Sequence, residues 1–152
     1  MSMKNYLTQD DIQSSMRDGR LRQILDSYSD DVTPESIFES ASKEAGGLLV
    51  DHLMHYQIME EFEKTGDDRS TSVIFHMKNI VIYILYDRIP DDDVPAKVIK
   101  NYNDTMETLG EISKGKLNIN LPKALIDIDG DGEGDVPKTK FRWGGEPPRR
   151  LS

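Results

Sequence analysis

The sequence contains no cysteine among its 152 residues. This absence excludes disulfide bonds, thiolate metal sites and cysteine nucleophiles. Long apolar runs are also scarce. The opening stretch MSMKNYLTQDD lacks the apolar core of a signal peptide, so we expect no such signal. In the most apolar segment, residues 73–89, the polar side chains of His76, Lys78 and Asn79 interrupt the run, so a membrane span is not expected.

Motifs that mark common enzymes are absent as well. The chain has no nucleophile elbow, phosphate-binding loop or dinucleotide-binding fingerprint. The glycine-rich GDGEGD at residues 130–135 does not qualify, because it is acidic where a phosphate would lie. We therefore expect no enzymatic activity and no cofactor.

The three histidines do not form a recognisable catalytic or metal-binding set. His52 and His55 are three residues apart on an expected helix, and glutamates follow within residues 60–63. A metal site would need two more ligands from elsewhere in the chain. We therefore expect ordinary helix-surface residues there and no metal, and we expect His76 to be a hydrogen-bonded core residue rather than a base.

Positive charge is in short supply. The chain has 19 Lys and Arg against 28 Asp and Glu, which gives a net charge of −9. From Lys123 onward, six basic and six acidic residues balance, so all of the excess negative charge lies in residues 1–122. Such a body repels phosphate, so tight general binding of nucleic acid is not expected.

The first helix start is marked by Thr8 and Asp11. Thr8 can cap the helix, and Asp11 falls at the third helical position, near the positive end of the helix dipole. This helix is expected to run to about Met16. Residues 20–28 predict a short second helical piece.

The same capping device recurs where Thr33 precedes Pro34. Apolar residues then follow in steps of three and four, which predicts one long amphipathic helix over residues 34–62. Gly46 and Gly47 interrupt this pattern. They are expected either to allow the close approach of another helix or to mark a kink.

Two more helices and an extended piece complete the body. Residues 73–86 are apolar on nearly every side, which predicts a central buried helix, with a buried strand as the competing interpretation. Residues 98–112 carry another helical stripe, which Lys114 and Gly115 should end. Residues 116–122 alternate in polarity and predict a short extended segment with no obvious partner strand.

Together these signals predict a mostly α protein. Residues 1–121 are expected to form a small bundle of four to five helices that includes one long helix and a short extended segment. Residues 122–152 are rich in glycine, proline and charge, and they are expected to form an extended C-terminal arm.

The acidic stretch at residues 127–135 partly matches a calcium-binding loop of the EF-hand type. With Asp127 at position 1, four later residues have the expected type: Asp129, Asp131, Gly132 and Asp135. Position 12, however, is Lys138 instead of a bidentate glutamate, and Pro137 lies where the exiting helix should begin. These departures favour a solvated hinge with glycines at Gly130, Gly132 and Gly134 over a metal site. A calcium-dependent binding module stays open as an alternative.

The end of the arm carries the residue types that anchor protein interfaces. The expected partner-binding residues are Phe141, Arg142, Trp143, Arg149 and Arg150. They lie in a segment too short and too polar to form its own core. The alternative is that Trp143 folds back onto the helical body.

Four stretches, in their order and spacing, resemble the Mu-like family of bacteriophage head–tail adaptor proteins. These stretches are NYLTQDDI, SASKEAGGLLVDHLMHY, NIVIYILYDRIP and NYNDTMETLGEISKGKLNINLP, which together cover about residues 5–122. The sequence departs from the family pattern at His55, where an arginine is usual, and at Val81, where an alanine is usual.

This resemblance implies a non-enzymatic structural protein of the virion. It implies a ring, usually of twelve subunits, beneath the portal in the phage neck, where it would extend the DNA channel. The implied partners are other copies of the chain, the portal protein and a stopper or tail-completion protein. DNA would pass through the lumen without specific binding, no membrane would be involved, and assembly would occur in the host cytoplasm. A small helical regulatory protein is a further alternative.

Overall fold

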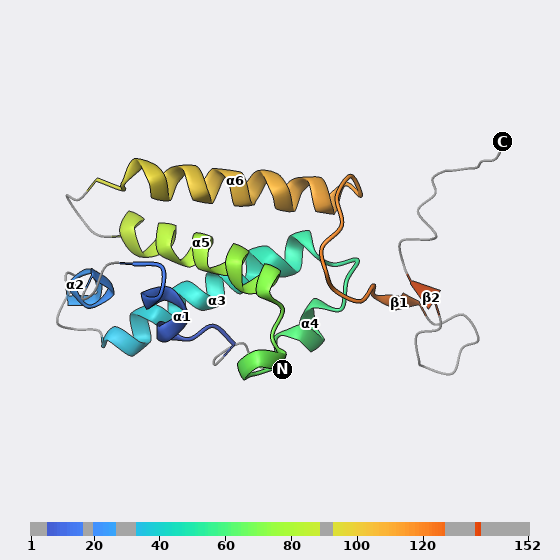
Figure 1. The fold of residues 1–152 in the computed structure, drawn as a ribbon, viewed down its shortest axis with the longest axis horizontal. Helices are drawn as coiled ribbons and strands as arrows, with labels where there is room; N and C mark the ends of the chain where they lie inside the picture. The colour runs from blue at the N-terminus through green and yellow to red at the C-terminus, as the bar shows by residue number, and fades with distance from the viewer. Residues whose placement is uncertain (1–5, 17–19, 27–32, 89–92, 127–135, 138–152) are drawn as a thin grey trace.

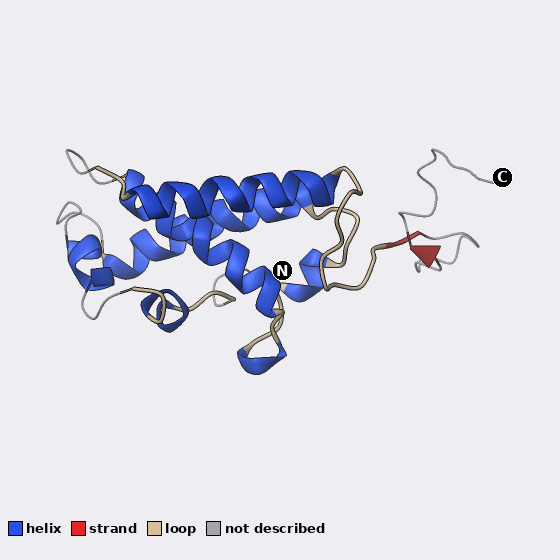
Figure 2. Ribbon diagram, turned by 45° about the horizontal axis from the view of Figure 1, so that its top comes forward, coloured by secondary structure: helices blue, strands red, loops and turns tan. Residues whose placement is uncertain are grey.

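The computed structural model describes residues 6–16, 20–26, 33–88, 93–126 and 136–137. Most of these residues are helical, as Figure 2 shows. The elements in chain order are α1 (Gln9–Gln13), α2 (Arg20–Asp26), α3 (Pro34–His52), α4 (Ile58–Glu61), a 3₁₀ turn η1 (Gly66–Asp68), α5 (Thr71–Asp87), α6 (Ala96–Ser113), β1 (Leu125–Ile126) and β2 (Val136–Pro137). The predicted class, a mostly α small bundle, is confirmed.

Helix α5 is the centre of the bundle. It packs against α3 on one side and α6 on the other, and it also contacts α1 and α2 (Figure 1). Its buried residues are Val73, Met77, Ile80, Val81, Ile84, Leu85 and Tyr86. The length of this segment and its contacts on several sides explain why it is a helix and not a buried strand.

The predicted helix starts are confirmed in atomic detail. The Thr8 hydroxyl accepts a hydrogen bond from the Asp11 amide at 3.2 Å, and the Asp11 carboxylate accepts one from the Thr8 amide at 2.8 Å. At α3, the Thr33 hydroxyl accepts from the Ser36 amide at 3.1 Å, and Pro34 is the first helical residue. Both caps satisfy amides that would otherwise lack a partner in the first turn of the helix.

The single long helix predicted over residues 34–62 is wrong. Helix α3 ends at His52, and α4 begins only at Ile58. The apolar pattern continues across the break because Leu53 and Tyr56 are buried although they are not helical. The spacing of apolar residues correctly indicated which residues are buried. It did not reveal the helix break, because the hydrophobic core continues across it.

The segment at residues 116–122, predicted to be extended with no obvious partner strand, contains no strand, and backbone pairing begins only at its end. The Gln57 amide donates to the Pro122 carbonyl at 2.8 Å, and the Ala124 amide donates to the His55 carbonyl at 2.8 Å. Tyr56 and Lys123 thus form an antiparallel bridge. The break between α3 and α4 leaves backbone groups free to pair with the chain that returns after α6.

The glycines behave differently at their two sites. Helix α3 passes through Gly46 and Gly47 without interruption, and no atom lies within 4 Å of the place that a Cβ of Gly47 would occupy. Neither a helix break nor a tight approach is therefore found at Gly47. At the end of α6, Gly115 has a φ of 81°, and this left-handed residue after Lys114 confirms the predicted helix end.

No helix in the described part of the chain is both long enough and apolar enough to cross a lipid bilayer. The strands β1 and β2 pair antiparallel, with Leu125 opposite Pro137 and Ile126 opposite Val136. Figure 1 shows this pair beyond one end of the helical body, past the end of α6, with α2 near the opposite end.

Candidate interaction groove and arm anchor

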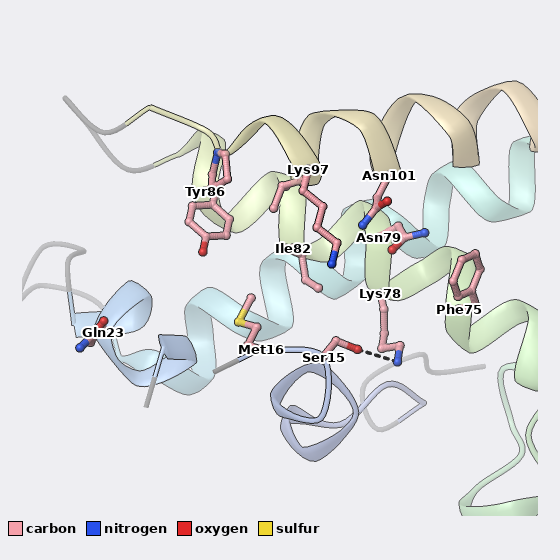
Figure 3. A pocket seen from close by; sticks show the side chains of 12 residues that line it. Ser15, Met16, Gln23, Phe75, Lys78, Asn79, Ile82, Tyr86, Lys97 and Asn101 are labelled. Carbon is pink, nitrogen blue, oxygen red and sulfur yellow. Dashed lines mark hydrogen bonds between the residues drawn. The ribbon is translucent and has the colours of Figure 1, made fainter. Parts of the chain in front are cut away.

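A groove of about 940 Å³ lies between the N-terminal helices, α5 and the first half of α6 (Figure 3). Its lining residues are Ser15, Met16, Gln23, Phe75, Lys78, Asn79, Ile82, Tyr86, Pro95, Lys97, Val98 and Asn101. Of these, Phe75 is the most exposed large apolar side chain, with 55% of its surface accessible. The lining of the groove therefore mixes apolar and polar side chains.

The groove exists because α6 is buried over only part of its length. The buried residues of α6 are Thr105, Leu109 and Ile112, all in its second half. In the first half, Val98 is only half-buried and Ile99 is exposed. The first half of this helix thus leaves apolar side chains of α5, and Met16 after α1, partly uncovered.

The charged groups of the groove are all cationic. The Lys78 ammonium donates to the Ser15 hydroxyl at 2.9 Å, and neither Lys78 nor Lys97 forms an ion pair with any described residue. No aspartate or glutamate lines the groove. Figure 3 shows both lysine side chains extending from their helices into the space between α6 and the N-terminal helices. The groove is thus locally positive in a protein whose net charge is −9.

A second site anchors the chain that follows α6. The Lys123 ammonium lies 4.7 Å from the centre of the Tyr56 ring, and the Tyr56 hydroxyl donates to the Asn118 side chain at 3.2 Å. The Gln57 side chain donates to the Lys123 carbonyl at 2.9 Å. Together with the Tyr56–Lys123 backbone bridge, these contacts form an anchor that holds residues 122–124 against the helical body immediately before β1.

A buried polar cluster joins the N-terminal segment to α4 and α5. Glu61 is buried, and its carboxylate accepts from the Tyr6 hydroxyl and from the Ser70 amide, both at 2.5 Å. Lys64 lies 3.2 Å from the other carboxylate oxygen. Burial, together with the hydrogen bond to Glu61, raises the pKa of Tyr6 far above its ordinary value. Tyr6 therefore stays protonated and donates to Glu61, which suits a structural role.

The same cluster extends through an ion pair between Arg69 and Asp11. The guanidinium donates to both oxygens of Asp11, at 2.5 and 3.2 Å, and also to the Tyr6 carbonyl at 2.7 Å. Burial opposes ionisation of Asp11, but hydrogen bonds from Arg69 and Thr8 outweigh it and keep the pKa of this carboxyl below its usual value. The sequence indicated Asp11 only as part of a helix cap, and no local signal indicated its second partner.

None of the three histidine side chains lines the groove. His52 contacts the Leu48 carbonyl through Nδ1 at 2.8 Å, as a helix-end residue does. The prediction of a hydrogen-bonded core histidine at His76 is wrong, because His76 is half-buried and its Nδ1 has no partner among the described residues. Burial lowers the pKa of His76. No group of three metal-ligating side chains occurs within the described ranges.

The predicted interface and hinge residues lie outside the described residues. These are the partner-binding residues Phe141, Arg142, Trp143, Arg149 and Arg150 and the hinge glycines Gly130, Gly132 and Gly134. The same holds for the carboxylates of the possible calcium loop at 127–135. Their roles stay predictions.

Comparison with protein families places these features in context. The family model described as Bacteriophage Mu, Gp36 matches residues 6–136, which include every helix of the bundle as well as the anchor. The chain belongs to this family. Comparison with curated proteins and with solved structures found no significant match. Membership of the Mu Gp36 family supports a role as a phage structural or assembly protein associated with the virion.

Proposed function

We propose that this member of the Mu Gp36 family is a head–tail adaptor. Copies of the chain form a ring, of twelve subunits by resemblance, that binds the portal protein on one side. On the other side the ring receives a stopper or tail-completion protein. DNA passes through its lumen without specific contacts, and the protein acts in the neck of the virion.

The observation that carries this proposal is the family match over residues 6–136. It covers the whole helical body and places the chain in a family of phage proteins. The acidic body supports the proposed channel wall, because a wall with excess negative charge repels the phosphates of passing DNA.

The anchor supports a role for the last residues in binding a partner. Residues 122–124 are fixed to the body through the Tyr56 bridge, and β1 and β2 lie beyond its end (Figure 1). The chain therefore leaves the helical body at a defined place. The aromatic and basic residues from Phe141 onward follow β2 closely in sequence, and such residues commonly dominate protein interfaces.

The test is head–tail joining by variants of these last residues. Deletion of residues 138–152 leaves the bundle, the anchor and β2 intact, so the variant should fold with an unchanged helical circular dichroism spectrum but should not join heads to tails. Phe141→Ala combined with Trp143→Ala should reduce joining in the same way, whereas Glu146→Ala should not. Normal joining by the deletion variant would refute the proposed role of these residues.

A further inference from the structure

The residues that line the groove between the N-terminal segment, α5 and α6 favour an acidic occupant. Two ammonium groups, Lys78 and Lys97, enter it without a carboxylate partner among the described residues, and no acidic side chain lines it. Apolar groups of Ile82 and Val98 line the same space. An occupant that pairs with the lysines and also covers these apolar groups must carry both carboxylates and an aliphatic side chain.

The chain itself contains a segment with this composition. Residues 127–135 read DIDGDGEGD, with five carboxylates, no basic residue and Ile128 between Asp127 and Asp129. In an extended backbone, alternate side chains point to opposite sides. An aliphatic residue can therefore enter a groove while the carboxylates on either side stay at its edge, where flexible lysine side chains can reach them.

A subunit does not reach its own groove with this segment. The ends of the segment are held together by the pairing of Ile126 with Val136, and a nine-residue connection held in this way extends at most about 17 Å. The part of α6 from Asn101 to its end at Ser113 already measures about 18 Å, and β1 lies beyond that end of the body (Figure 1). The occupant must therefore come from another molecule.

We propose that the groove binds the acidic segment 127–135 of a second copy of this chain. This inference deepens the proposed function and rests on its ring of identical subunits. The contact is heterologous, because the groove of one subunit receives a segment from a different place on its neighbour. Contacts of this kind generate a ring when the rotation between neighbours closes. In this proposal the carboxylates of residues 127–135 pair with lysines of a neighbouring subunit and do not bind calcium.

The first test is binding of a synthetic peptide of residues 123–138 to the isotope-labelled full-length protein, followed by NMR. Within a ring, the effective concentration of one subunit's segment at its neighbour's groove is in the millimolar range. The peptide titration should therefore extend to millimolar concentration. We expect saturable shifts of amide signals in α5 around Lys78 and in the first half of α6 around Lys97. Absence of shifts at millimolar peptide, or shifts confined to other helices, would overturn the proposal.

Charge variants make the test specific. Lys78→Gln combined with Lys97→Gln should weaken peptide binding at least about fivefold, since two ion pairs are lost. The matched control is Lys43→Gln combined with Lys100→Gln, which removes the same charge from exposed positions outside the groove and should change affinity less than twofold. Equal weakening by both pairs would mean that only net charge matters, which contradicts a defined site.

A charge exchange provides the second control. The protein with Lys78→Glu and Lys97→Glu should not bind the natural peptide but should bind a peptide with Asp127→Lys and Asp129→Lys. Failure of this rescue when both proteins show the same thermal stability would count against direct pairing. Stronger shifts of the groove signals by a short DNA duplex than by the peptide would assign the lysines to phosphate and overturn the proposal.

The outcome separates this inference from the proposed function. If the groove variant fails to bind the peptide but still joins heads to tails, the adaptor role stands without the groove contact being needed for it. If the peptide binds in the groove but the protein is absent from phage necks, the contact between copies stands and the adaptor role fails.

Discussion

At the scale of single residues, the polar cluster around Glu61 is the feature that local sequence patterns least predict. Glu61 is buried beneath Tyr6, although the two are 55 residues apart in the chain. Burying a carboxylate is costly unless hydrogen bonds and a cation compensate, and here Tyr6, Ser70 and Lys64 do so. Helix caps such as that of Thr8 could be predicted because both partners lie within one turn. The burial and hydrogen bonding of Glu61 could not be predicted in this way, because its partners come from three segments of the chain.

Replacement of Glu61 by alanine should destabilise the protein by about 2–3 kcal/mol, because the buried Tyr6 hydroxyl and the Ser70 amide each lose their acceptor. Glu61→Gln should cost less, since its amide oxygen still accepts one hydrogen bond. Urea unfolding measures both free energies, with the exposed neighbour Glu60→Ala as a control expected within about 0.5 kcal/mol of the natural chain. A loss at Glu61→Ala no larger than this control would contradict the structural role.

The Asp11 carboxylate should make stability depend on pH in the acid range. Its pKa is lower in the folded protein than the ordinary value, because hydrogen bonds from Arg69 and Thr8 exceed the opposing effect of burial. Its contribution is therefore fully present above the unfolded pKa of about 3.9 and is lost as pH falls through the lower folded pKa. The difference in unfolding free energy between the natural chain and Asp11→Asn should be constant from pH 5 to 7 and shrink below about pH 4. A difference independent of pH would refute the pairing with Arg69.

At the scale of elements, the sequence predicted the helix ends that carry a local capping signal and missed one that does not. Thr33 and Pro34 mark the start of α3 locally, and Gly115 marks the end of α6 in the same way. The end of α3 at His52 has no such mark, because buried Leu53 and Tyr56 continue the helical period through a non-helical turn. That turn is specified by its pairing with residues 122–124, which is a long-range contact that periodicity does not report.

The groove illustrates the same limit for functional sites. In the sequence Lys78 marked only an interruption of an apolar run, and no pattern indicated Lys97. Their approach to one space depends on how α6 crosses α5, which is a property of tertiary packing. The interface residues Phe141 and Trp143 were predicted from residue type alone, so their role stays a prediction.

At the scale of the whole molecule, three features bear on assembly. The helical bundle is acidic, the anchor at Tyr56 fixes where the chain leaves it, and the groove at Lys78 offers a cationic site on the same body. The proposed adaptor ring would use each of them. Negative charge suits a DNA channel, a segment beyond the anchor reaches a partner, and a groove receives a neighbouring subunit.

The most direct test of the adaptor role is cryo-electron microscopy of purified phage particles, with mass spectrometry to show that the chain is present. The account predicts a ring of density in the neck, directly beneath the portal, into which copies of the bundle of α3, α5 and α6 fit with their acidic surfaces toward the channel. Absence of the chain from purified particles, or its location in the capsid shell or the distal tail, would contradict the account.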